Sequence, residues 1–119
     1  MSTQEVANRL VELCRADQFV AAIDELYDKD VVSKEPDIAQ HEVASGFNAV
    51  KAKTAKFEES IEQMHSFSVS EPIVAADHFA IVMEIDATYK GHGRMALSEI
   101  CVYEVKNGKI VKDVFFYNM

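Results

Sequence analysis

The chain of 119 residues is long enough for one domain with its own hydrophobic core, without disulfides or a structural metal. Hydrophobic residues make up 49% of it and charged residues 27%, which is typical of globular domains and excludes a disordered chain. The formal net charge of -8 argues against nucleic acid or an anionic membrane as a partner, because a polyanion would be repelled.

Cysteine usage and hydropathy set limits on the compartment. Cys14 and Cys101 lack CxxC spacing, and the chain starts without an apolar signal segment, so we expect free thiols and a cytoplasmic location. No apolar run approaches the ~18 residues of a membrane-spanning helix. We find no repeat and no linker, and we expect a single domain over residues 1–119.

Two helices are predicted in the first quarter of the chain. Ser2 or Thr3 can cap the first, and its apolar side chains recur at helical spacing as far as Cys14. A second, shorter helix is predicted over residues 19–27. The charged residues 28–30 are expected to form the turn that ends it.

The middle of the chain alternates between extended and helical patterns. Residues 31–36 are predicted to be extended, because a proline disfavours the helical conformation at the preceding Glu35. Residues 37–45 are polar and predicted to be a loop. A long helix is predicted over residues 47–64, with one apolar stripe and a solvated back that carries Lys51, Lys53, Lys56, Glu58, Glu59 and Glu62.

Strands dominate the second half. Residues 66–74 are predicted to be extended, and a proline within them indicates an edge strand or a bulge. Apolar and polar residues then alternate over residues 79–89, 95–105 and 110–117, the period of half-buried strands. Asn-Gly at 107–108 is the dipeptide that a two-residue type I′ turn requires. Three helices followed by an antiparallel meander predict an α+β domain, with the helices on one face of the sheet.

Three carboxylates are candidates for acid–base chemistry. Glu35 precedes a proline at the end of an extended segment, and it can be a general base if an apolar pocket desolvates it and raises its pKa. Glu99 shares a strand face with apolar residues, where a charge is costly unless it is paired or protonated. Asp113 lies between Val111 and Phe115 on one face and is a candidate acid, base or ligand anchor.

Each carboxylate has a plainer alternative. Glu35 can be an exposed glutamate of an acidic protein, and Asp113 can be a surface aspartate. Glu99 can lie on an outer face or pair with a neighbouring arginine or tyrosine. The even-numbered side of residues 94–104 is also largely apolar, which indicates that both sides of this strand are covered, one by the helices and the other by a second subunit.

Other kinds of chemistry find no support. The four histidines have no spacing typical of metal ligands, so no metal site is expected. There is no nucleophile elbow, no phosphate-binding glycine loop and no dinucleotide fingerprint. The sequence therefore favours acid–base chemistry without a cofactor.

The order of elements resembles the nuclear transport factor 2-like superfamily, which includes ketosteroid isomerase-like and SnoaL-like polyketide cyclase domains. The resemblance lies in residues 11–13, 16–19, 26–28, 31–36, 46–50, 103–111 and 116–118. It implies a cone-shaped α+β barrel, with three N-terminal helices packed in a strongly curved, mostly antiparallel sheet around a deep apolar pocket. It also implies a homodimer formed through the outer face of the sheet.

Compared by position, Glu35 matches the aspartate base that isomerase-like members keep just before a proline. The tyrosine and the protonated aspartate that such isomerases use would fall at Leu10 and Cys101, so the resemblance does not extend to steroid isomerase activity. The same register turns a set of side chains inward, with Phe57 added from the long helix: Ile81, Met83, Ile85, Leu97, Glu99, Cys101, Asp113, Phe115 and Tyr117.

The predicted function is the binding of a compact apolar or aromatic molecule, with isomerase, cyclase or hydrolase chemistry as a possible activity. Glu35 would be the base, Glu99 and Asp113 would orient or protonate the ligand, and the ligand-binding residues would be Phe57, Ile81, Met83, Leu97, Cys101, Tyr103, Phe115 and Tyr117. Tyr103 and Tyr117 would donate their hydroxyls. The alternatives are a non-catalytic ligand-binding or dimerisation module, expected if side chains fill the pocket, and a partner-docking protein.

Overall fold

The computed structural model describes residues 1–118 and contains helices followed mainly by strands. In this part of the chain the helices are α1 (Thr3–Arg15), α2 (Phe19–Leu26), α3 (Phe47–Ser60) and a 3-10 turn, η1 (Asp37–Ala39). The strands are β1 (Tyr27–Lys34), β2 (Ala44–Ser45), β3 (Ile61–Val69), β4 (Ile73–Ala75), β5 (His78–Tyr89), β6 (Gly93–Lys106) and β7 (Lys109–Phe116).

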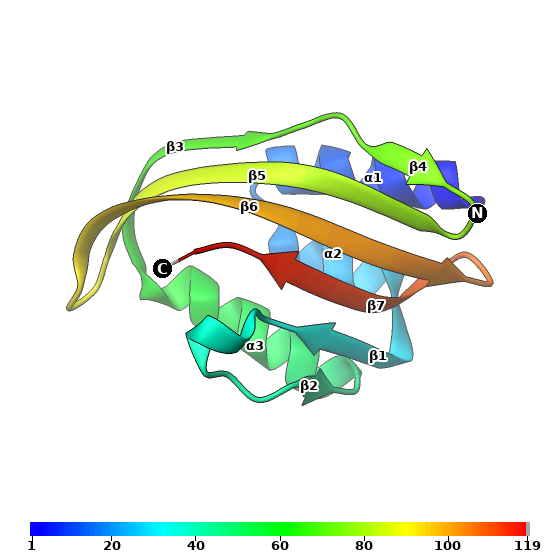
Figure 1. Cartoon of the computed structure of the whole chain (residues 1–119), viewed down its shortest axis with the longest axis horizontal. Coiled ribbons are helices and arrows are strands. Elements are labelled where there is room, and N and C mark those ends of the chain that lie inside the picture. The colour runs from blue at the N-terminus through cyan, green and yellow to red at the C-terminus, as the bar shows by residue number, and fades with distance from the viewer. Residues whose placement is uncertain (119) are drawn as a thin grey trace.

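The seven strands form one sheet in the order β2-β1-β7-β6-β5-β3, and β4 pairs with β5. All pairs are antiparallel except β1 with β7, which are parallel. Figure 1 shows β5 and β6 crossing the molecule with α1 and α2 behind them, and α3 beside β1. The predicted α+β class and the mostly antiparallel meander are therefore confirmed.

Local sequence explains where α1 begins and how β6 turns into β7. The Ser2 hydroxyl accepts a hydrogen bond from the Glu5 amide, and the Glu5 carboxylate accepts one from the Ser2 amide, which completes a capping box. At the predicted Asn107-Gly108 turn both residues have positive φ, 53° and 74°, as a type I′ turn requires. Both predictions are confirmed.

Two predicted boundaries are wrong because pairing between strands overrides the local pattern. The charged residues 28–30 do not form a turn but lie in β1, where Tyr27 pairs with Ile110 of β7. The long helix ends at Ser60 rather than at residue 64, and Ile61 begins a strand paired with β5. The short apolar pattern at Ile61 and Met64 does not distinguish a helix from a strand. Pairing with the edge of β5 stabilises the strand.

The predicted loop over residues 37–45 contains η1 and the short strand β2, which pairs with β1. The predicted extended segment 66–74 divides into β3 and β4, with Pro72 in the gap between them.

Alternation along β5 separates a buried face from an exposed one. Phe79, Ile81, Met83 and Ile85 are each buried, while the even-numbered residues between them are partly or fully exposed. The Phe79 ring stacks on that of Tyr103 in β6 with 4.7 Å between centroids. These side chains form one hydrophobic core with the buried faces of α1 and α2.

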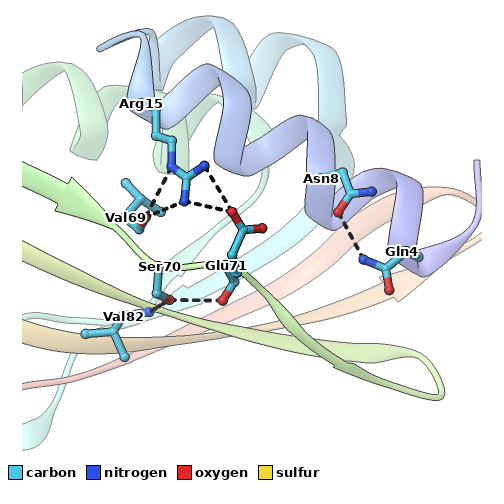
Figure 2. A network of polar contacts seen from close by, with 7 residues as sticks. All are labelled: Gln4, Asn8, Arg15, Val69, Ser70, Glu71 and Val82. Carbon is cyan, nitrogen blue, oxygen red and sulfur yellow. Dashed lines mark hydrogen bonds and ion pairs between the residues drawn. The ribbon is translucent and has the colours of Figure 1, made fainter.

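Arg15 ties the end of α1 to the β3–β4 connection, as Figure 2 shows. Its guanidinium donates to the Val69 carbonyl at 2.7 Å and pairs with Glu71 at 3.3 Å. The Ser70 hydroxyl in the same connection accepts a hydrogen bond from the Val82 amide. Among residues 1–118, no helix is long and apolar enough to cross a membrane.

Candidate functional site

A cavity of about 270 Å³ lies between the helices and the sheet. Apolar side chains of α1 and α2, among them Leu10, Phe19 and Ile23, form one part of its wall. Residues of α3 form a second part, and the odd-numbered faces of β5, β6 and β7 form a third. The wall is mainly apolar, and the polar groups are concentrated where β1, β7 and α3 meet.

Most of the predicted site residues lie in this wall. The carboxylates Glu35, Glu99 and Asp113 all line the cavity, together with Phe57, Met83, Leu97, Tyr103, Phe115 and Tyr117. Ile81 and Cys101 do not. They are register partners on β5 and β6 and belong to the packed core, at 1% and 0% exposed.

A buried polar cluster joins β1, β7 and α3. Parallel pairing places Ser33 of β1 opposite Asp113 of β7, which brings their side chains together. The Tyr27 hydroxyl donates to Asp113 Oδ2 at 2.5 Å, and the Lys53 ammonium donates to Ser33 Oγ at 2.6 Å. Burial raises the pKa of Tyr27 well above its ordinary value, and the adjacent Asp113 adds to the effect, so the tyrosine remains a hydrogen-bond donor.

Asp113 is 2% exposed, and its Oδ1 has no hydrogen-bond partner. Burial raises the pKa of its carboxyl, while the Ser33 and Tyr27 hydroxyls and the Lys53 charge act in the opposite direction. An unpartnered oxygen in the cavity wall is able to accept a hydrogen bond from a ligand or, when protonated, to donate one.

Glu35 follows the last residue of β1, and its side chain is 19% exposed. Its Oε1 lies 4.0 Å from the Lys53 ammonium, and its Oε2 is buried with no hydrogen-bond partner. Burial raises the pKa of Glu35, Lys53 opposes this shift, and Asp113 adds to it. A desolvated carboxylate with a free oxygen is suited to remove a proton from a bound molecule.

Glu99 lies on β6 just beyond the part paired with β7, which begins at Ile100. Burial raises the pKa of its carboxyl to about 7, with the neighbouring Glu35 as the next cause. The Cys101 thiol, 3.6 Å from Glu99 Oε1, and Lys53 act against the shift. At neutral pH this group can therefore give up or take a proton.

The sequence prediction placed Lys53 wrongly and did not identify Tyr27 or Ser33 as site residues. The sequence predicts Lys53 on the solvated back of its helix, but its side chain lines the cavity and its ammonium lies 5.1 Å from the centre of the Phe115 ring. The signal was present: Lys53 lies three residues after Val50 and four before Phe57, which places it on the apolar face of α3.

A metal site requires several ligand side chains that lie close together. Within residues 1–118, no three His, Cys, Asp or Glu side chains are placed to hold a metal ion. The polar side chains in the cavity wall include carboxyls, hydroxyls and the Lys53 ammonium group.

The sequence matches the SnoaL-like domain family over residues 1–117. A protein from Mesorhizobium loti, provisionally named a SnoaL-like polyketide cyclase, is 31% identical, and its structure superposes with a TM-score of 0.89 over 98% of this chain and 100% of its own. No curated protein matches the chain.

Two less similar structures share the fold. A nuclear transport factor 2-like protein of unknown function from Burkholderia pseudomallei is 16% identical, with a TM-score of 0.79 over 99% of this chain and 92% of its own. A provisionally named isomerase from Bacillus subtilis is 20% identical, with a TM-score of 0.76 over 99% of this chain and 90% of its own. These matches agree with the superfamily that the order of elements predicts.

Proposed function

The chain belongs to the SnoaL-like domain family, and from this premise we propose that it binds a compact hydrophobic or aromatic molecule and catalyses acid–base chemistry on it without a cofactor. An isomerase, cyclase or hydrolase reaction would meet this description. The observation that carries the proposal is that Glu35, Glu99 and Asp113 line one apolar cavity, which Phe57, Met83 and Phe115 border rather than fill.

Glu35 is the general base in this proposal. Its unpartnered Oε2 is the atom that would accept the proton, and an apolar wall makes the carboxylate more basic than it is in water. A positioned base contributes roughly 10²–10⁴-fold to a rate.

Glu99 and Asp113 are the proposed acid and anchoring groups. The two carboxyls have raised pKa values, that of Glu99 about 7, so the protonated form of each is more available than for an ordinary carboxyl. Tyr117, whose pKa burial and Glu35 raise to about 12, is a further hydroxyl donor. Groups whose environments differ in this way can divide the roles of acid and base.

The relatives offer support of a general kind. One is provisionally named a polyketide cyclase and another an isomerase, the reaction classes named in the proposal. Because the same fold hosts many functions, the argument rests on the cavity and not on these names.

A nitrobenzisoxazole offers a test that needs no knowledge of the natural substrate. A base removes its ring C–H proton, the ring N–O bond breaks, and a coloured nitrophenolate forms. We expect the protein to catalyse this reaction and Glu35→Gln to lower kcat/KM by about 100-fold or more. Glu59→Gln, which changes an exposed glutamate of α3, is the matched control. Equal rates for Glu35→Gln and the unaltered protein would remove Glu35 from the mechanism.

We also propose that the outer face of the sheet forms a homodimer. Val82, Ile100 and Phe116 are 38%, 48% and 54% exposed and lie side by side in register across β5, β6 and β7. A contiguous apolar row on a sheet face is typical of a protein contact. Sedimentation should give a dimer for the unaltered chain and a monomer for Ile100→Glu. A monomer in both would contradict this part of the proposal.

A further inference from the structure

We propose that Lys53 is a catalytic residue that binds the substrate oxygen on which negative charge develops when Glu35 removes a proton. The substrate class is then a neutral carbonyl compound with a C–H group next to its carbonyl. This inference rests on the proposed function and adds to it the residue of this chain that stabilises the charge.

The surroundings of Lys53 fix its ammonium group beside the base. One N–H bond is directed at Ser33 Oγ, 2.6 Å away, and the Phe115 ring supports the charge from 5.1 Å. The nearest oxygen of Glu35 is at 4.0 Å, beyond hydrogen-bond distance. Since an ammonium has three N–H bonds, this leaves N–H groups for a ligand in the cavity.

The other donors in the wall are neutral hydroxyls, among them those of Tyr89, Tyr103 and Tyr117. The Tyr27 hydroxyl is already donated to Asp113. Among the described residues that line the cavity, Lys53 carries the one cationic side chain. Charge that develops on a substrate oxygen would find its strongest partner there.

The movement of charge through the reaction explains why this placement helps. When Glu35 takes the proton, the C–H electron pair forms a carbon–carbon double bond and the carbonyl π pair moves to oxygen as an enolate. Glu35 is then neutral and no longer attracts Lys53. The newly formed enolate oxygen carries the negative charge and attracts Lys53 in its place. Where a carbon–carbon double bond lies next to the reacting C–H carbon, the enolate extends over it, and return of the proton from Glu35 to the far carbon of that bond restores both the carbonyl and the carboxylate. The reaction is then balanced without an oxidant or a reductant.

The charges around Lys53 also set the charge of the substrate. The titratable groups that act on it are Glu35, Glu99 and Asp113. Glu35 and Lys53 carry opposite charges 4.0 Å apart, and the wall around them is mainly apolar, which favours a ligand without charge. A carboxylate substrate would meet an anionic base, which is repulsive.

An enolate mimic in a variant with a neutral base tests this directly. Glu35→Gln reproduces the neutral state of the base, and para-nitrophenol is the probe, because its phenolate form absorbs at a different wavelength from the phenol. We expect Glu35→Gln to bind the phenolate and to lower the apparent pKa of the bound probe below that of the free probe. Adding Lys53→Met should weaken phenolate binding by roughly 10-fold or more.

Three controls separate this role from a structural one. Lys53→Arg in the same background should retain most of the phenolate binding, since the positive charge and the donors are kept. Lys56→Met, an exposed lysine of α3, should change nothing. Thermal unfolding of each variant verifies that it is folded.

Equal phenolate binding with and without Lys53, or no phenolate binding to Glu35→Gln, would overturn the role of Lys53. Either result leaves the proposed function standing if Glu35→Gln still loses the nitrobenzisoxazole reaction. Full activity of Glu35→Gln in that reaction would instead overturn the proposed function, whatever the phenol binding shows.

Discussion

The two ends of the helix–sheet interface use the same strands but differ in what they enclose. The start of β5 and the end of β6 lie near the N-terminus, right in Figure 1. In this part of the strands Phe79 stacks on Tyr103 in the packed core, and Tyr103 also borders the cavity. We call this the closed end. Toward the β5–β6 turn, left in Figure 1, Met83 pairs with Glu99 and Ile85 with Leu97, and all four line the cavity. We call this the cavity end.

This comparison separates what orients the side chains from what fills the space between the helices and the sheet. The period of two along β5 and β6 decides which side chains turn toward the helices, and it is the same at both ends. The helix side chains that face the strands decide whether the space between the helices and the sheet is filled. Apolar side chains of α1, such as Val6, fill the closed end, while α3 presents Lys53 and Thr54 to the cavity end.

The largest expected difference is in stability. Phe79→Ala should lower the free energy of unfolding by about 3–5 kcal/mol, because it opens a void in a packed core. Phe57→Ala removes a half-buried ring from the cavity wall and should lower it by less than about 2 kcal/mol. Denaturant titration of both variants measures the difference, and equal losses would contradict the distinction between the two ends.

The next effect is the pH dependence of stability at the cavity end. Folding raises the pKa of Glu99 from 4.5 to about 7, so the folded state binds its proton more tightly than the unfolded state. The resulting stabilisation is full below pH 4.5 and is lost as the pH rises toward 7, by up to about 3 kcal/mol. Glu99→Gln should reduce this slope in denaturant titrations across that range, and the part that remains belongs to Glu35 and Asp113, whose pKa values are also raised. Glu104→Gln, on the same strand, is the control, and an undiminished slope in Glu99→Gln would contradict the assignment.

A smaller effect is expected at the buried cluster between the two ends. Tyr27→Phe keeps the ring but leaves Asp113 Oδ2 without its donor, which should cost about 1–3 kcal/mol of unfolding free energy. It should also raise the pKa of Asp113 further, since that hydrogen bond favours the charged carboxylate. Denaturant titration measures the first effect and carboxyl NMR titration the second. A lowered pKa would show that Tyr27 does not stabilise the carboxylate.

The smallest effect concerns the turns at the two ends. Gly108 has φ 74° and a Cβ there would lie 2.9 Å from the Met1 nitrogen, whereas Gly91 has φ 79° and open space around it. Replacing either by alanine imposes strain of about 1 kcal/mol, and Gly108→Ala adds the clash with Met1. Thermal unfolding should show a larger loss for Gly108→Ala than for Gly91→Ala, and the reverse order would contradict this view of the closed end.

Short-range patterns were enough to predict the meander and its faces. Period-two alternation and the Asn107-Gly108 turn are local features, and they predict that Glu99 and Asp113 lie on the same side of the sheet. The order of helices and strands was sufficient for the superfamily. The strong curvature and the cone shape implied by that resemblance stay predictions.

What the sequence could not predict depends on partners distant along the chain. Whether Ile61 continues a helix or starts a strand is decided by the edge of β5, and whether residues 28–30 turn or extend is decided by β7. The Tyr27–Asp113 hydrogen bond joins residues 86 positions apart. Lys53 is a different case, because its charge favours the solvated side of α3 while its spacing from Val50 and Phe57 favours the apolar side.

The central claim is that the cavity end acts through the carboxylate of Glu35. The most direct measurement is the pH profile of kcat/KM for the nitrobenzisoxazole in the unaltered protein and in Glu35→Gln. The account predicts a rate that rises with pH through an apparent pKa above 4.5 in the unaltered protein, and a flat profile about 100-fold lower in the variant. A single profile shared by both proteins would contradict it.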